Sequence, residues 1–99
     1  MRSMSTARKG GDAEQAVARQ LRSEGYLVVR SAASKGPVDL VAIDSERIML
    51  IQVKYNARVS PAERRELQGL AARVPRSTQV WTWERWKRET EWRAKRIKP

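Results

Sequence analysis

The sequence contains no cysteine, no histidine and no phenylalanine. The first two absences exclude disulfides, thiol nucleophiles, Cys/His zinc sites, histidine-based catalytic triads and haem held by either residue. No stretch approaches the ~20 consecutive apolar residues of a membrane-spanning helix. Residues 1–6 also lack the apolar core of a signal peptide, so we expect the chain to stay in the cytoplasm and not to be secreted.

These absences limit the chemistry that the chain can perform. Any resident metal should be a hard cation held by oxygen, most naturally Mg²⁺ or Mn²⁺. Any catalysis must then use carboxylates, lysine, hydroxyl groups or water activated by such an ion.

Positive charge, in contrast, is abundant. The 99 residues include 21 Lys and Arg against 11 Asp and Glu, which gives a net charge of +10 at pH 7. Arginine supplies 15 of the 21 and suits bidentate recognition of phosphate. A chain of this length fits one domain, and its charge predicts a nucleic-acid partner. The alternatives are a solvated basic surface and a ribosome-associated protein without chemistry of its own.

Apolar spacing and turn signals predict a single α/β domain over residues 1–99, with a mixed sheet and the element order α-β-β-β-α-β-β. We expect residues 1–9 to form a flexible basic arm. The expected helices cover 12–23 and 61–74, and the expected strands cover 26–31, 38–43, 48–54, 78–86 and 91–97.

Three predicted helix ends depend on specific residues. Asp12 is a candidate N-cap, because a carboxylate accepts the unpaired N–H groups of a first helical turn. Gly25 can adopt the left-handed conformation that ends a helix. Ser60, Pro61 and Glu63 have the form of a capping box with proline at the first helical position.

Polar side chains interrupt the second and third predicted strands near one end of their hairpin. Asp39 begins the second strand, whereas Gln52 and Lys54 lie two residues apart near the end of the third and so share a face. A tight loop at 44–47 makes these strands antiparallel neighbours and brings the three side chains together. Glu14 joins them if the first helix packs across the sheet.

This cluster has a catalytic and a structural interpretation. The carboxylates of Glu14 and Asp39 offer oxygen ligands to a hard divalent cation. The amide oxygen of Gln52 and the backbone carbonyl of Val53 offer two more. Lys54 would then orient the attacking water or stabilise charge on phosphorus. In the structural alternative, Asp39 and Lys54 form a cross-strand ion pair and Gln52 is an ordinary edge residue.

The motifs around these residues resemble archaeal-type Holliday junction resolvases, which belong to the restriction-endonuclease-like PD-(D/E)XK nuclease superfamily. The likeness implies a restriction-endonuclease-like core. It is close over roughly residues 8–55 and extends to the remaining half only by element order. The segments that carry it, in matching order and at matching intervals, are Arg8-Lys9-Gly10 with Glu14, residues 29–34, residues 38–42 and Ile51-Gln52-Val53-Lys54.

The resemblance implies roles for individual residues. Glu14 and Asp39 match the family's metal-binding carboxylates, and Lys54 matches its catalytic lysine. Gln52 stands where most members have a second glutamate, so the site loses one negative charge. Ser34 matches a loop serine beside the scissile phosphate. The basic positions that match DNA contacts are Arg8, Lys9, Arg30 and Lys35.

The resemblance also implies the reaction and the partners. We expect a Mg²⁺- or Mn²⁺-dependent endonuclease, active as a symmetric homodimer that resolves four-way DNA junctions by paired phosphodiester hydrolysis. No membrane and no small-molecule substrate are expected, and the enzyme would work at a nucleoid or a viral replication site. The alternatives are a nuclease of the same fold that cuts flaps, forks or duplex, and a junction-binding protein inactivated by Gln52.

The predicted C-terminal strands contain all four tryptophans. Trp81 and Trp83 share one face of their strand, where they pack in the core or form a dimer contact. Base stacking is a third possible use of these rings.

Overall fold

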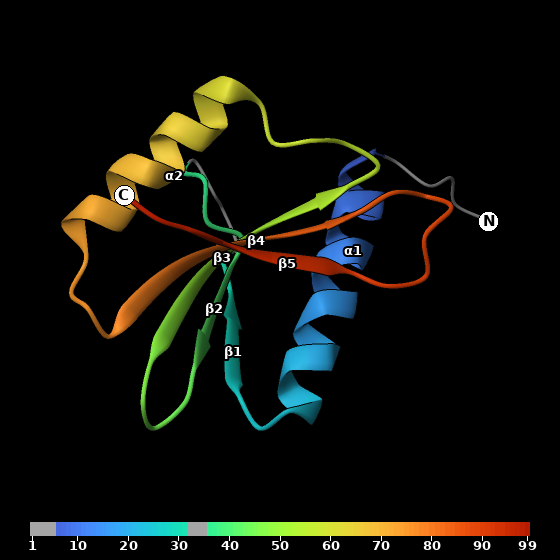
Figure 1. The fold of residues 1–99 in the computed structure, drawn as a ribbon. Helices are drawn as coiled ribbons and strands as arrows, with labels where there is room; N and C mark the ends of the chain where they lie inside the picture. Colours follow the sequence, from blue (N-terminus) through green and yellow to red (C-terminus); the bar gives the residue numbers. More distant parts are fainter. Residues whose placement is uncertain (1–5, 32–35) are drawn as a thin grey trace.

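The computed structural model describes residues 6–31 and 36–99, which contain two helices and a five-stranded sheet (Figure 1). The predicted α/β class and element order are confirmed. None of the described helices is long and apolar enough to cross a membrane. The elements are α1 (Thr6–Ser23), β1 (Leu27–Arg30), β2 (Leu40–Ile43), β3 (Ile48–Tyr55), α2 (Pro61–Arg73), β4 (Thr78–Arg85) and β5 (Arg93–Ile97).

Helix α1 begins earlier than the sequence predicts. The expected N-cap at Asp12 is wrong, because the helix already starts at Thr6. Residues 6–9, which we expected in the basic arm, therefore form its first turn. Lengthening an existing helix adds one hydrogen bond for each residue ordered, whereas starting one does not. That gain offsets the cost of roughly 1 kcal/mol for each of Gly10 and Gly11 in a helix interior.

The predicted end of α1 is confirmed. Gly25 has a φ of 100°, and its N–H donates to the carbonyl of Arg22. The N–H of Tyr26 donates to the carbonyl of Leu21, which completes the two-bond pattern typical of a glycine-terminated helix. The chain thus turns sharply into β1, and α1 packs back across β1, β2 and β3.

The five strands follow one another in sequence order across the sheet. Only β3 and β4 are parallel, and α2 forms the crossover between them. The β2–β3 hairpin pairs Leu40 with Ile51, so the next position along the hairpin sets Asp39 opposite Gln52. This is the register that the predicted loop at 44–47 requires.

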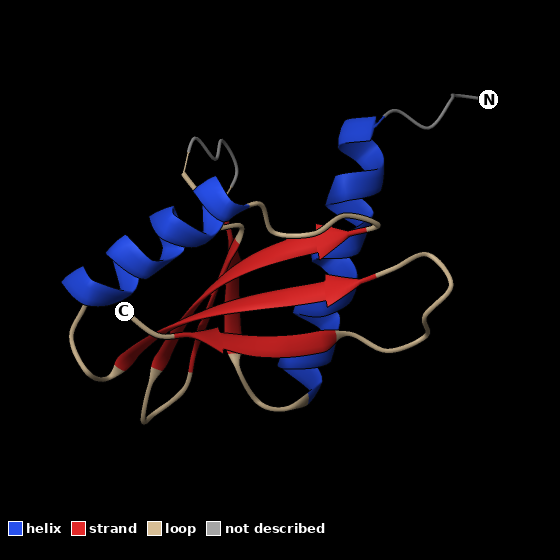
Figure 2. Cartoon of the chain, turned by 45° about the horizontal axis from the view of Figure 1, so that its top comes forward, coloured by secondary structure: helices blue, strands red, loops and turns tan. Residues whose placement is uncertain are grey.

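The two helices cover opposite faces of the sheet (Figure 2). Buried residues on the α1 face include Val17, Leu21, Leu40, Ile51 and Trp83. On the other face Leu67 of α2 packs against Val80 and Ile97. Because α2 contacts β4 and β5, no described helix covers β1 and β2 on that face.

The tryptophans divide between the interior and its border. Trp83 is 7% exposed and belongs to the core on the α1 face, so its core interpretation is confirmed. Trp81 and Trp92 are partly buried and pack against the same core. The ring of Trp86 lies 5.9 Å from the guanidinium carbon of Arg58.

Candidate active site

Asp39 lies directly before β2, where the hairpin with β3 opens. Its backbone N–H donates to the carbonyl of Ile51 at 2.8 Å, and its carbonyl accepts from the N–H of Ser31 at 2.9 Å. Its carboxylate Oδ2 accepts the N–H of Val53 at 2.8 Å. The strands on both sides therefore fix the position of this carboxylate.

The surroundings of Asp39 disfavour its negative charge. Burial raises the pKa of the Asp39 carboxyl above its ordinary value. The hydrogen bond from Val53 and the positive charge of Lys54 lower that pKa, whereas the negative charges of Glu14 and Glu63 raise it further. A cation beside Asp39 would offset the energetic cost of burying the charged carboxylate. It would also weaken the repulsion from Glu14 and Glu63.

Gln52 contributes a buried oxygen to the same place. The residue is 6% exposed, and its Oε1 has no hydrogen-bond partner within the described part of the chain. The β3–β4 pairing sets it beside Thr82, whose hydroxyl is also buried and unpartnered there. An unsatisfied buried acceptor costs about 1–3 kcal/mol, so an electropositive ligand for Gln52 Oε1 would be stabilising.

Lys54 is held by α2. Its Nζ donates to Glu63 Oε2 at 2.6 Å, and Glu63 Oε1 accepts the N–H of Ser60 at 2.9 Å. The second contact confirms the predicted capping box. The hydrogen bond from Lys54 is the main cause that holds the pKa of Glu63 below its ordinary value. The hydrogen bond from the Ser60 N–H lowers that pKa further. The alternative of a cross-strand pair between Asp39 and Lys54 is wrong for the described residues, where Glu63 is the partner of Lys54.

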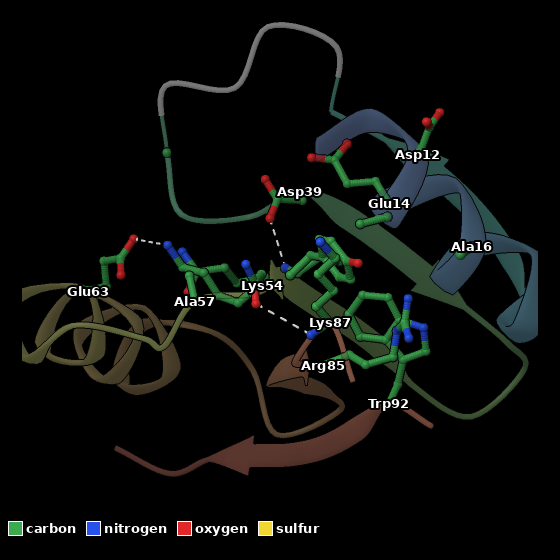
Figure 3. Close-up of a pocket in the computed structure, with 16 residues that line it drawn as sticks. Asp12, Glu14, Ala16, Asp39, Lys54, Ala57, Glu63, Arg85, Lys87 and Trp92 are labelled. Carbon is green, nitrogen blue, oxygen red and sulfur yellow. Dashed lines mark hydrogen bonds and ion pairs between the residues drawn. The ribbon is translucent and has the colours of Figure 1, made fainter. Parts of the chain in front are cut away.

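Glu14 reaches this cluster from α1, which covers the sheet face opposite to α2. Helix α1 places its carboxylate near Asp39, as Figure 3 shows, and the charges of the two residues interact. Arg30 of β1 donates from Nη2 to Glu14 Oε1 at 3.3 Å. Arg30, which the sequence analysis predicted to contact DNA, neutralises part of the local negative charge in the structure.

These side chains line an open groove of about 920 Å³. The groove unites Glu14, Asp39, Gln52, Val53 and Lys54, as the hairpin register and the helix packing predict. Other residues that the sequence did not assign to a site also line the groove, among them Tyr55, Asn56, Glu63, Arg85, Lys87 and Trp92. Most of these residues lie at the ends of β3 and β4 or in the loops that follow these strands. The parallel β3–β4 pairing brings them together, and the sequence carries no short-range signal for that pairing.

Some expected positions have no described side chain. Ser34 and Lys35 lie outside the described residues, whereas Arg8 and Lys9 fall in the first turn of α1. Within 6–31 and 36–99, no group of three or more acidic side chains is arranged to hold a metal ion. A cation in the groove would therefore depend on amide or backbone oxygens as well as on carboxylates.

Comparison with known proteins identifies the family. The model of the archaeal Holliday junction resolvase (hjc) family matches residues 5–94. The chain belongs to this family. It is therefore a junction-resolving nuclease, a DNA-binding hydrolase of recombination and repair, as the sequence motifs predicted. No curated protein matches the chain in a sequence search.

The solved structures include a similar fold. Hjc of Archaeoglobus fulgidus, a Holliday junction resolvase from an archaeal hyperthermophile, matches with a TM-score of 0.71 and 22% sequence identity. The match covers 90% of this chain and 73% of that one. At this identity the likeness establishes the shared fold, and the roles of individual groove residues have to be argued from their own surroundings.

Proposed function

We propose that this resolvase hydrolyses phosphodiester bonds in the groove beside Asp39, with a divalent cation, Mg²⁺ or Mn²⁺, as its cofactor. The observation that carries the proposal is the unpartnered, buried Oε1 of Gln52, which the hairpin sets opposite Asp39. A hard cation prefers such amide and carboxylate oxygens. The same cation would offset the burial that raises the pKa of the Asp39 carboxyl.

The residues present fit a cation of this class. Asp39 and Glu14 would supply negative charge, and Gln52 and the carbonyl of Val53 would supply neutral oxygens. Because glutamine replaces a second acid, we expect weaker cation affinity than a three-carboxylate site would give. When bound, the cation supplies an activated water and neutralises charge on the phosphate.

Lys54 has the chemistry to act on the phosphate. Its ammonium lines the groove and is tethered at 2.6 Å to Glu63, which limits its motion. A cation so positioned can orient the attacking water or stabilise negative charge that develops on phosphorus. Glu63 would act through Lys54 and so serves as a positioning residue.

The net charge of +10 supports binding along DNA backbones. We assign phosphate contacts to Arg8, Lys9, Arg30 and Lys35, and a contact beside the scissile phosphate to Ser34. Because such contacts carry little base information, junction recognition would rest on shape and charge. DNA at a nucleoid or a viral replication site would be the place of action.

We further propose a homodimer. Each chain has one groove of this kind, and resolving a four-way junction symmetrically requires two incisions. β1 is an edge strand, and its Leu27 and Val29 are 63% and 50% exposed on the sheet face that no described helix covers. A second copy seated on this face would bury both side chains.

The decisive experiment is cleavage of a labelled four-way junction beside linear duplex and flap DNA of matching sequence. It compares wild type with Asp39→Asn, in Mg²⁺ and in chelator. Paired symmetric nicks on the junction alone, lost in chelator and in the variant, are expected. Cutting of all three substrates would favour the related nuclease with broader substrates. Tight binding without cutting under any metal would favour an inactive binder, and full activity of Asp39→Asn would overturn the assigned site.

A further inference from the structure

Arg85 ends β4 beside the proposed catalytic cluster and contacts two aromatic rings. Its guanidinium carbon is 5.0 Å from the ring centre of Tyr55 and 5.4 Å from that of Trp92. The two rings are themselves 6.5 Å apart at an interplanar angle of 48°. All three residues line the groove, and Figure 3 shows Arg85 against Trp92.

The position of Arg85 is fixed by its neighbours. The parallel β3–β4 register pairs it with Tyr55, one residue after Lys54. Asn56 adopts a φ of 57°, a left-handed conformation that asparagine tolerates, and its N–H donates to the Arg85 carbonyl at 2.8 Å. Arg85 Nη1 donates to the carbonyl of Glu89 in the β4–β5 loop. Backbone hydrogen bonds and cation–π contacts thus hold the guanidinium in the groove wall.

Within the described part of the chain, the charge of Arg85 lacks the carboxylate partner that Lys54 and Arg30 have. Lys54 is paired with Glu63, and Arg30 is paired with Glu14. Among the salt bridges of the described residues, none involves Arg85, and its Nε is buried without a hydrogen-bond partner there. A partly desolvated cation attracts an anion more strongly than an exposed one does, because solvent screens it less.

We propose that Arg85 binds a backbone phosphate of the DNA strand that occupies the groove, and that Tyr55 and Trp92 hold its guanidinium for this contact. The terminal N–H groups of the guanidinium can donate to phosphate oxygens, and the contacts with both rings limit its orientations. Lys87, which also lines the groove, adds positive charge at the same end. The inference rests on the proposed function only in requiring DNA in the groove.

The test neutralises one DNA phosphate at a time with a methylphosphonate and measures junction binding in chelator, where no cleavage occurs. In wild type, we expect one or two positions near the cleavage site at which neutralisation weakens binding about ten-fold. Arg85→Gln should weaken binding to the unmodified junction by a similar factor and be insensitive to neutralisation at those positions. Its salt slope should fall by roughly 0.7–0.9, the value for one lost phosphate contact.

Two further variants separate phosphate binding from other roles. Arg76→Gln removes one charge from an exposed position before β4 and should keep the wild-type sensitivity at every position. The strand that separates it from Arg85 spans roughly 23 Å from Thr78 to Arg85. Arg85→Lys keeps the charge and should retain part of the sensitivity. If Arg85→Gln melts at the wild-type temperature yet keeps the full methylphosphonate pattern, Arg85 contacts no phosphate and the proposal is wrong.

Failure of this proposal and failure of the proposed catalytic site give different results. The binding measurement needs neither Asp39 nor a metal, so a misassigned catalytic site leaves the Arg85 pattern intact. If Arg85→Gln lowers the melting temperature, the methylphosphonate comparison is repeated with Arg85→Lys. Weakening only when bases beside the cut are removed, with no position sensitive to phosphate neutralisation, would instead favour base stacking on Trp92 and overturn the phosphate assignment.

Discussion

Lys54 and Glu63 form an ion pair of 2.6 Å that joins the end of β3 to the first turn of α2. Glu63 also caps its own helix by accepting the N–H of Ser60. The same carboxylate therefore fixes the start of α2 and the position of the proposed catalytic lysine. Any change in the placement of α2 would reach the groove through this pair.

Glu63→Gln separates these two tasks. Glutamine can complete a capping box, but it removes the negative charge that holds Lys54. We expect the single-turnover cleavage rate to fall by about ten-fold while junction affinity in chelator changes little.

Lys54→Ala should lower the rate of the chemical step further, by roughly 10²–10³-fold, which is the range found when one donor that stabilises a transition state is removed. Collapse of binding in Lys54→Ala would show that Lys54 is mainly a phosphate contact.

Glu63 also predicts a pH dependence of stability. The pKa of Glu63 in the folded chain lies below its ordinary value of 4.5, so the ion pair stabilises the fold above about pH 4.5. That contribution is lost as the pH falls from there through the lower folded pKa. Glu63→Gln should lower the free energy of unfolding at pH 7 by at most about 1 kcal/mol. Urea unfolding at pH 7 and pH 3.5 should show the difference between wild type and variant shrinking in acid. A constant difference would contradict the assignment.

Most of the fold could be predicted from local signals. Gly25 and the Ser60 capping box end and begin helices through their own backbone geometry, and the 44–47 loop sets the hairpin register. The start of α1 could not be predicted, because the gain from extending a helix outweighs the preference of Asp12 for an N-cap position.

The site was predictable to the extent that it is local. Asp39, Gln52 and Lys54 belong to one hairpin, so their proximity follows from strand pairing. The partner of Lys54 and the place of Arg85 depend on the α2 crossover and the parallel β3–β4 register. Such long-range pairings have no fixed spacing in the sequence.

Asp39→Asn tests the cation independently of cleavage. Burial makes the Asp39 charge unfavourable in the cation-free chain, so the variant should melt at an equal or higher temperature than wild type. Mg²⁺ at ten times its dissociation constant should stabilise wild type by about 1.4 kcal/mol and the variant by much less. Calorimetry with Mg²⁺, and with Na⁺ at equal ionic strength as the control, measures this. Equal stabilisation of both proteins would place the cation elsewhere.

Gln52→Glu introduces the acid that the family resemblance of the sequence implies at this position. The variant should remain active and reach half-maximal cleavage at a lower Mg²⁺ concentration, by about ten-fold, because a third carboxylate joins the site. Without metal it should be less stable than wild type, since another negative charge is buried beside Asp39.

Thr82→Val is the matched control for Gln52→Glu. It removes the neighbouring unpartnered hydroxyl and should leave the Mg²⁺ dependence of cleavage unchanged. Complete loss of activity in Gln52→Glu, with the fold intact, would show that the neutral amide itself is required.

The exposed face of β1 predicts how two copies meet. Replacing Leu27 with Ser and Val29 with Thr together keeps strand-compatible residues while removing most of the exposed apolar surface on this edge strand. If a second copy covers this face, sedimentation should show a dimer for wild type and a shift to monomer for the double variant. The monomer should then nick one strand of a junction without the paired second cut.

Val59→Thr changes a partly buried position against the α2 core and serves as a control for general loss of packing. A dimer that persists in the double variant would place the interface on another surface, and a monomeric wild type that still cuts both strands would exclude the need for a dimer.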